Sequence, residues 1–203
     1  MFTEYEIETL IEIEEIAQAT TALKKEFLKK EAPYLEISDQ DFFSLIMMVP
    51  TVGIALANSD ISFFEEMSLN RKARKLSKGG YFWGKDPVVF SLKFVIKNYA
   101  LWEDKFLAVI RTCMERSFDI HAMEGSYDPR ATITISQYRK QVLQMPYIFI
   151  RFLSSFFLEE DDSIFSTRKM DQVDYKRLLS IGEKLGLTTI PFFHYFCATI
   201  EVH

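Results

Sequence analysis

Cysteine, glycine, proline and histidine are all scarce in this chain of 203 residues. The two cysteines, Cys113 and Cys197, lie far apart inside apolar helical patterns, which argues against a disulfide framework or a cysteine metal site and favours buried free thiols. Seven glycines and six prolines interrupt the chain so rarely that long helices are favoured over many short strands. With three histidines and no nucleophile motif, any catalytic pairing would have to be assembled by the fold.

Other absences exclude further classes of protein. Neither a G-x-G-x-x-G nor a G-x-x-x-x-G-K phosphate loop occurs. The net charge of −5 argues against general nucleic-acid binding, so no specific nucleic-acid partner is expected. The first residues are acidic where a signal peptide would be basic, and together with the free thiols this predicts a cytoplasmic protein. The apolar run 42–57 is shorter than the roughly 20 residues of a membrane span, which predicts a buried core helix.

Residues that can form a hydrophobic core are abundant. Hydrophobic residues make up 48% of the chain and charged residues 26%, and there are nineteen phenylalanines. No stretch has the composition of a flexible linker. We therefore expect residues 1–203 to form a single all-α domain, a bundle of about nine helices.

Capping residues and apolar spacing place the helices. We expect helices at about 4–32, 40–57, 62–79, 102–118, 136–145, 147–158, 169–185 and 189–200, and one that opens at Asp86-Pro87, with a kink at Pro50 in the second. Segments 42–57 and 147–158 should be the central apolar helices. The alternating run Thr132–Ile135 fits either a short strand or the cap of the next helix.

The sequence has two sets of the same pattern: an apolar helix with a proline, then an acidic turn, then a charged helix. The first set runs from Met48 through Asp60 to Gly79, and the second from Met145 through Asp162 to Gly186. This pattern suggests a duplicated helical hairpin with pseudo-twofold symmetry.

The two acidic turns are the candidate metal sites. Hard divalent cations such as Ca²⁺ or Mg²⁺ need several converging carboxylate oxygens, and the candidates are Asp60, Glu65, Asp161 and Asp162. Neither turn has EF-hand spacing. The alternative is that these acids satisfy the free N–H groups and the dipole at the start of a helix.

The run from Gly53 to Glu66 resembles the apolar helix, Asp-rich turn and Ile-Ser-x-x-Glu helix start of TerB-like domains, which are associated with tellurite resistance. The matching positions are Ala57, Asp60, Ile61, Ser62 and Glu65. Asn58 departs from the usual Asp, and the Gly-x pair that normally follows Asp60 is missing. The resemblance implies an all-helical fold whose acidic residues hold a divalent metal.

A second candidate site is the basic, aromatic-interleaved stretch 71–85. It holds Arg71, Lys72, Arg74, Lys75, Lys78 and Lys85, with no acid between Met67 and Lys85. A phosphate, a lipid headgroup or a nucleic-acid strand would suit it. The alternative is that the cations complement the C-terminal dipole of their helix while Tyr81–Trp83 fold onto the core.

A third candidate is Asp119 with His121 and Glu124, which offer oxygen and nitrogen ligands at close spacing. The alternative is a loop histidine that is solvated or bonded to a backbone carbonyl.

Three functional hypotheses follow. The first is a non-enzymatic cytoplasmic interaction or scaffold domain, TerB-like and stress-related, which binds protein partners or a second copy of itself and weakly binds Ca²⁺ or Mg²⁺ at its acidic turns. The second is an anion-binding or peripheral membrane-surface module that uses residues 71–85. The third is a metal-dependent enzyme built around Asp119, His121 and Glu124. No other cofactor is expected.

Overall fold

The computed structural model describes residues 2–79, 86–130, 133–158 and 168–203. In the first half, α1 spans Glu4–Ile11, α2 Glu14–Glu31, α3 Asp39–Ala55, α4 Phe63–Leu76, α5 Pro87–Lys97 and α6 Tyr99–Ser117. The second half contains η1 His121–Met123, α7 Ile135–Val142, α8 Tyr147–Ser154, α9 Gln172–Lys184, η2 Leu187–Thr189 and α10 Pro191–Ala198. Strands β1 Arg168–Met170 and β2 Ile200–Val202 pair in parallel, with Met170 opposite Val202.

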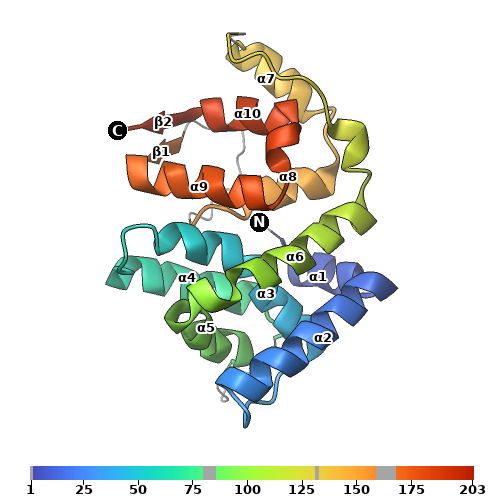
Figure 1. Ribbon diagram of the computed structural model, residues 1–203, viewed down its shortest axis with the longest axis vertical. Helices are drawn as coiled ribbons and strands as arrows, with labels where there is room; N and C mark the ends of the chain where they lie inside the picture. The colour runs from blue at the N-terminus through green and yellow to red at the C-terminus, as the bar shows by residue number, and fades with distance from the viewer. Residues whose placement is uncertain (1, 80–85, 131–132, 159–167) are drawn as a thin grey trace.

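The predicted all-α class is confirmed, with ten α-helices in the described residues. Figure 1 shows α1 to α6 in the lower part of the molecule and α7 to α10, with both strands, in the upper part. Buried side chains from both parts belong to one continuous core. In the described part of the chain, no helix is long and apolar enough to cross a membrane.

Helix α3 is the centre of the bundle. Every residue from Asp41 to Ala55 is buried, Pro50 included, as predicted for the apolar run 42–57. The helix packs against α1, α2, α4, α5, α6 and α9. Gly53 is needed where α6 approaches, because a Cβ there would lie 2.2 Å from the hydroxyl oxygen of Tyr99. That hydroxyl donates to the carbonyl of Val49 at 3.1 Å.

A buried carboxylate joins the two parts of the molecule. Glu103 of α6 is 6% exposed and pairs with two cations of α9, Arg177 at 3.0 Å and Lys184 at 2.9 Å. Arg177 also donates to the carbonyl of Gly53 on α3, at 3.2 Å. Two cations of α9 thereby pair with the carboxylate of α6, where an unpaired buried charge would be costly, and Arg177 also joins this junction to α3.

The helix starts follow the predicted caps. The side chains of Thr3, Ser38, Ser62 and Asp86 accept backbone N–H groups at the starts of α1, α3, α4 and α5. Thr134 caps α7 in the same way, in a capping box with Gln137. Of the two alternatives for the run Thr132–Ile135, the helix cap is therefore the correct one at Thr134. Thr132 lies outside the described residues.

Three boundaries differ from the prediction. The expected helix at 4–32 is two helices, because the chain is extended at Ile13 although the apolar spacing continues through it. The last helix stops at Ala198 and the chain continues as β2, whose partner β1 is distant in sequence. Helix α8 ends at Ser154 rather than near 158, and it buries Phe149, Phe152 and Leu153 while Tyr147 is 60% exposed, so it packs through one side and is not a central helix like α3.

The described residues do not repeat the hairpin. Helix α4 follows α3 after a short turn and packs against it. In the second set, α8 has eight residues against seventeen in α3, and β1 precedes α9. Helix α9 packs against α3 of the first set. The acidic run Glu159–Asp162 lies outside the described residues.

Candidate functional site

The first acidic turn begins α4 and is held by its own backbone. The hydroxyl of Ser62 accepts the N–H of Glu65 at 3.3 Å, and the carboxylate of Glu65 accepts the N–H of Ser62 at 2.7 Å. This reciprocal cap engages Glu65, as the alternative reading of the acidic turns predicts. Asp60 is exposed in the preceding turn.

The structure places this turn against the start of α9. The amide of Asn58 donates to the carboxylates of Asp171 at 3.1 Å and Asp174 at 3.3 Å. Burial, followed by the negative charges of Asp171 and Glu65, raises the pKa of the Asp174 carboxyl. Spacing alone did not single out Asp171 and Asp174, although Asp171 is a recognisable helix cap with an acid three residues later.

Among the described residues, no group of three or more His, Cys, Asp or Glu side chains could hold a metal ion. The predicted ligands Asp161 and Asp162 lie outside the described residues, so the second half of that prediction is not placed.

The basic stretch lies mainly on α4, which is visible in Figure 1 at the edge of the lower part. At about 100° per residue, six side chains fall within an arc of about 120° on the outward side of this helix. They are Phe63, Phe64, Met67, Arg71, Arg74 and Lys75, all exposed. Exposed Lys78 follows directly after the end of the helix. We call these seven residues the α4 surface.

No carboxylate lies within this arc. Glu66 projects about 60° to one side of it and Glu65 about 80° to the other, where Glu65 folds back to Ser62. The exposed face of a helix normally mixes charges of both signs. Here the side chains within the arc itself are basic or apolar, in a chain whose net charge is −5.

The apolar members of the α4 surface were missed by the sequence analysis. Phe63 is 70% exposed, Phe64 78% and Met67 44%. Of the phenylalanines that the structure describes, these two alone are exposed. Their rings touch in a T-shaped pair with centroids 6.0 Å apart. Helical phase would have found them, because they lie opposite Leu69 and Leu76.

Lys72 is not part of this surface. It is 4% exposed, and its ammonium group donates to the carbonyls of Ser155 at 2.6 Å and Phe157 at 3.0 Å, just after the end of α8. It also donates to the hydroxyl of Thr51 on α3. The sequence carried a sign of this, because Lys72 is three residues after Leu69 and four before Leu76, on the inner face. Lys85 lies outside the described residues.

The inner side of α4 is anchored firmly. The hydroxyl of Ser44 donates to the carbonyl of Leu76 at 2.7 Å, and the buried carboxylate of Asp41 accepts the N–H of Lys78 at 2.8 Å. The hydroxyl of Ser77 donates to the carboxylate of Asp86 at 2.8 Å. These bonds fix the position and rotation of α4, so its outward arc is a preformed surface.

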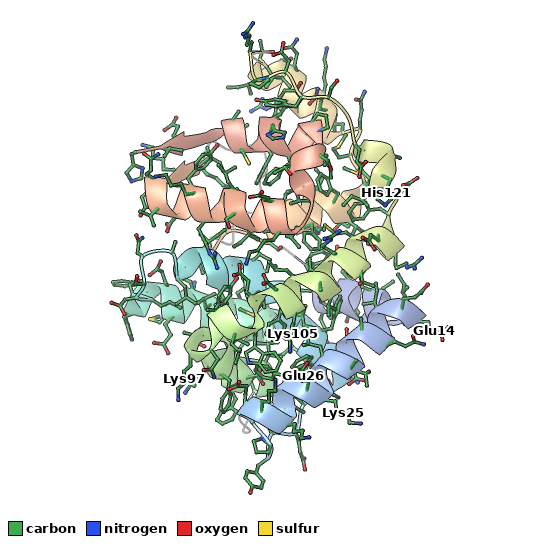
Figure 2. All side chains as sticks on the ribbon, viewed as in Figure 1. Glu14, Lys25, Glu26, Lys97, Lys105 and His121 are labelled. Atoms are coloured by element: carbon green, nitrogen blue, oxygen red, sulfur yellow. The ribbon has the colours of Figure 1, made fainter. Side chains whose placement is uncertain are left out.

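Asp119, His121 and Glu124 form a surface turn. The carboxylate of Asp119 accepts the N–H of Ala122, and His121 Nδ1 lies 3.0 Å from a carboxylate oxygen of Glu124. The His121 side chain is 75% exposed, and Figure 2 shows it at the outer edge of the molecule. The adjoining hollow has about 50 Å³. A site of this size and exposure gives little support to the enzyme hypothesis.

Two larger hollows lie elsewhere. A groove of about 580 Å³ between α1, the end of α6 and the start of α8 is lined by Tyr5, Leu10, Ile13 and Ile148, among others. Glu6 at its border is held by Tyr147 at 2.7 Å and by Arg151 at 3.0 Å. A hollow of about 330 Å³ adjoins β1 and the start of α9. None of these three hollows is lined by α4.

Comparison of the chain with models of known protein families, with curated proteins and with solved structures finds no match in any of the three.

Proposed function

We propose that this protein is a non-enzymatic binding domain that docks on polyanionic surfaces through the α4 surface. One observation carries the proposal. The outward arc of α4 gathers the exposed cations Arg71, Arg74 and Lys75 together with exposed apolar side chains, although acids outnumber bases in the chain by 29 to 24. Clustering basic side chains on one exposed side of a rigid helix favours contact with anionic groups.

The attraction between the α4 cations and an anionic surface is large enough to measure. A Lys or Arg held at an anionic lipid surface gains about 1 kcal/mol at physiological ionic strength. Arg71, Arg74 and Lys75 together would gain about 3 kcal/mol, or roughly a hundredfold in affinity. Because α4 is already fixed by Leu69, Leu76 and Lys72, little ordering entropy opposes docking.

The test is a charge-removal variant that spares the core. The triple variant Arg71→Gln, Arg74→Gln, Lys75→Gln should lose roughly a hundredfold in binding to anionic vesicles or to immobilised heparin, measured by co-sedimentation and by column retention. Lys72 is left unchanged, because its removal would test folding and not binding.

The matched control removes three cations elsewhere. Lys25→Gln, Lys29→Gln, Lys140→Gln makes the same change in net charge at exposed positions of α2 and α7; Figure 2 shows Lys25 on the outer side of α2. This control should bind like the parent. Equal losses in both triple variants would mean that total charge matters and the α4 surface does not, and the proposal would fail.

The proposal keeps part of the sequence-based hypothesis of a cytoplasmic interaction domain. Free thiols are typical of a reducing compartment such as the cytoplasm. Docking through α4 requires neither a metal at Asp60 and Glu65 nor membership of the TerB-like family.

A further inference from the structure

The α4 surface joins aromatic to basic groups, and this combination points to the chemistry of its partner. We infer that the polyanionic surface is an anionic phospholipid bilayer, on which α4 lies flat with Phe63, Phe64 and Met67 inserted among the headgroups. The inference rests on the proposed function, and it adds the apolar contact that a purely ionic site would lack.

The apolar side chains distinguish a bilayer from a dissolved polyanion. Phe63 and Phe64 have no hydrogen-bonding atoms and are 70% and 78% exposed, so a hydrated polysaccharide or polyphosphate would leave them in water. A bilayer interface removes aromatic rings and a methionine from water while Arg and Lys reach the headgroup phosphates. Basic residues alternate with apolar ones around the arc, as in helices that lie in this interface.

The shape of the surface favours a plane over a strand. A single-stranded nucleic acid is usually held in a positively charged groove with bases stacked on flat aromatic faces. Helix α4 lines none of the three hollows described above, and Phe63 and Phe64 at its start are 70% and 78% exposed. The edge-to-face packing of Phe63 against Phe64 covers part of a ring that a base would need.

The deciding variant is Phe63→Ser, Phe64→Ser. Both side chains are largely in solvent, so the change should leave the melting temperature near that of the parent. Binding to vesicles of phosphatidylcholine with phosphatidylserine should fall by at least about tenfold, because the apolar insertion is lost. Retention on heparin should stay at the parental level, because the cations remain.

Insertion can be observed directly at the same position. Native Cys113 and Cys197 are buried, so a thiol-reactive fluorophore would label the new cysteine of a Phe64→Cys variant. Its emission should shift to the blue with anionic vesicles and should be quenched by lipids brominated in the upper acyl chain. A label at Lys25→Cys on α2 should show neither effect.

The outcomes separate the two proposals. If the Phe pair variant binds vesicles like the parent, or if the label at position 64 stays in water, the bilayer inference is overturned while anion binding through α4 stands. The same holds if the parent prefers heparin or an oligonucleotide to anionic vesicles. If the parent binds none of these polyanions, both proposals fail.

Discussion

The ammonium group of Lys72 lies 2.7 Å from the hydroxyl oxygen of Thr51, inside the protein. The same hydroxyl donates to the carbonyl of Ser155, which also accepts from Lys72. This cluster binds α4 to α3 and to the chain leaving α8. Lys72, which the sequence places within a basic stretch, is thus a buried residue that links α4 to α3 and to the chain after α8.

Lys72→Met should therefore destabilise the fold. Buried acceptors such as the Phe157 carbonyl would lose their donor, and leaving such a group unsatisfied costs about 1–3 kcal/mol. Urea denaturation would measure the loss. Arg74→Met, two residues along the same helix but exposed, should change the free energy of unfolding by less than about 0.5 kcal/mol. Equal effects at both positions would contradict the role of Lys72.

Glu103 and its neighbour Asp104 provide a matched pair for the junction of α6 with α9. Both carboxylates contact Lys184, but Glu103 is buried and the Asp104 side chain is 82% exposed. Glu103→Ala should cost about 3 kcal/mol or more, because Arg177 and Lys184 lose their buried partner. Asp104→Ala should cost less than about 1 kcal/mol. Thermal and urea melts would compare them, and similar losses would refute the assigned junction.

The native thiols should be inert. Burial raises the pKa of Cys113 and that of Cys197 to about 12, so almost no thiolate forms at neutral pH. Ellman's reagent should react with neither in the native protein and with both in denaturant. Rapid labelling of either one before unfolding would show that the core around it opens.

Asp174 predicts a pH dependence of stability. Burial first, and then the charges of Asp171 and Glu65, raise the pKa of its carboxyl in the folded state. The folded protein therefore holds this proton more tightly than the unfolded chain. The contribution is fully stabilising below the unfolded pKa and is lost as pH rises through the folded pKa. At pH 7, Asp174→Asn should melt at a higher temperature than the parent, and the difference should vanish in acid.

The neighbouring carboxylate, Asp171, should affect stability at pH 7 in the opposite direction. The N–H of Asp174, followed by the amide of Asn58, lowers the pKa of Asp171, and this carboxylate caps α9. Asp171→Asn should be destabilising at pH 7.

Thermal melts in millimolar CaCl₂ test for a cation at the junction of Asn58 with Asp171 and Asp174. A bound cation would raise the melting temperature of the parent and not that of Asp174→Asn.

Local chemistry made much of the fold predictable. Caps such as Ser62 and Asp86 need only neighbouring residues, so spacing located the starts of α4 and α5. The charge-free run 42–57, most of which forms α3, is likewise visible from consecutive residues alone. The break at Ile13 and the pairing of β1 with β2 depend on distant partners, and no local pattern shows them.

The site was predicted in part because composition was used without helical phase. Counting cations found Arg71, Arg74 and Lys75, but it also included Lys72, which points inward. The exposure of Phe63 and Phe64 follows from helical phase, because they lie opposite Leu69 and Leu76, which face the core. The contact of Asn58 with Asp171 joins segments too far apart for spacing to reveal.

Two solvent-facing phenylalanines also affect the free protein. Exposed apolar pairs promote self-association, while like charges at Arg71, Arg74 and Lys75 repel a second copy that approaches face to face. Added salt shortens the range of that repulsion and of the attraction to lipid alike. Rising ionic strength should therefore weaken binding to an anionic membrane and, at high protein concentration, promote self-association. The same cations thus control both solubility and docking.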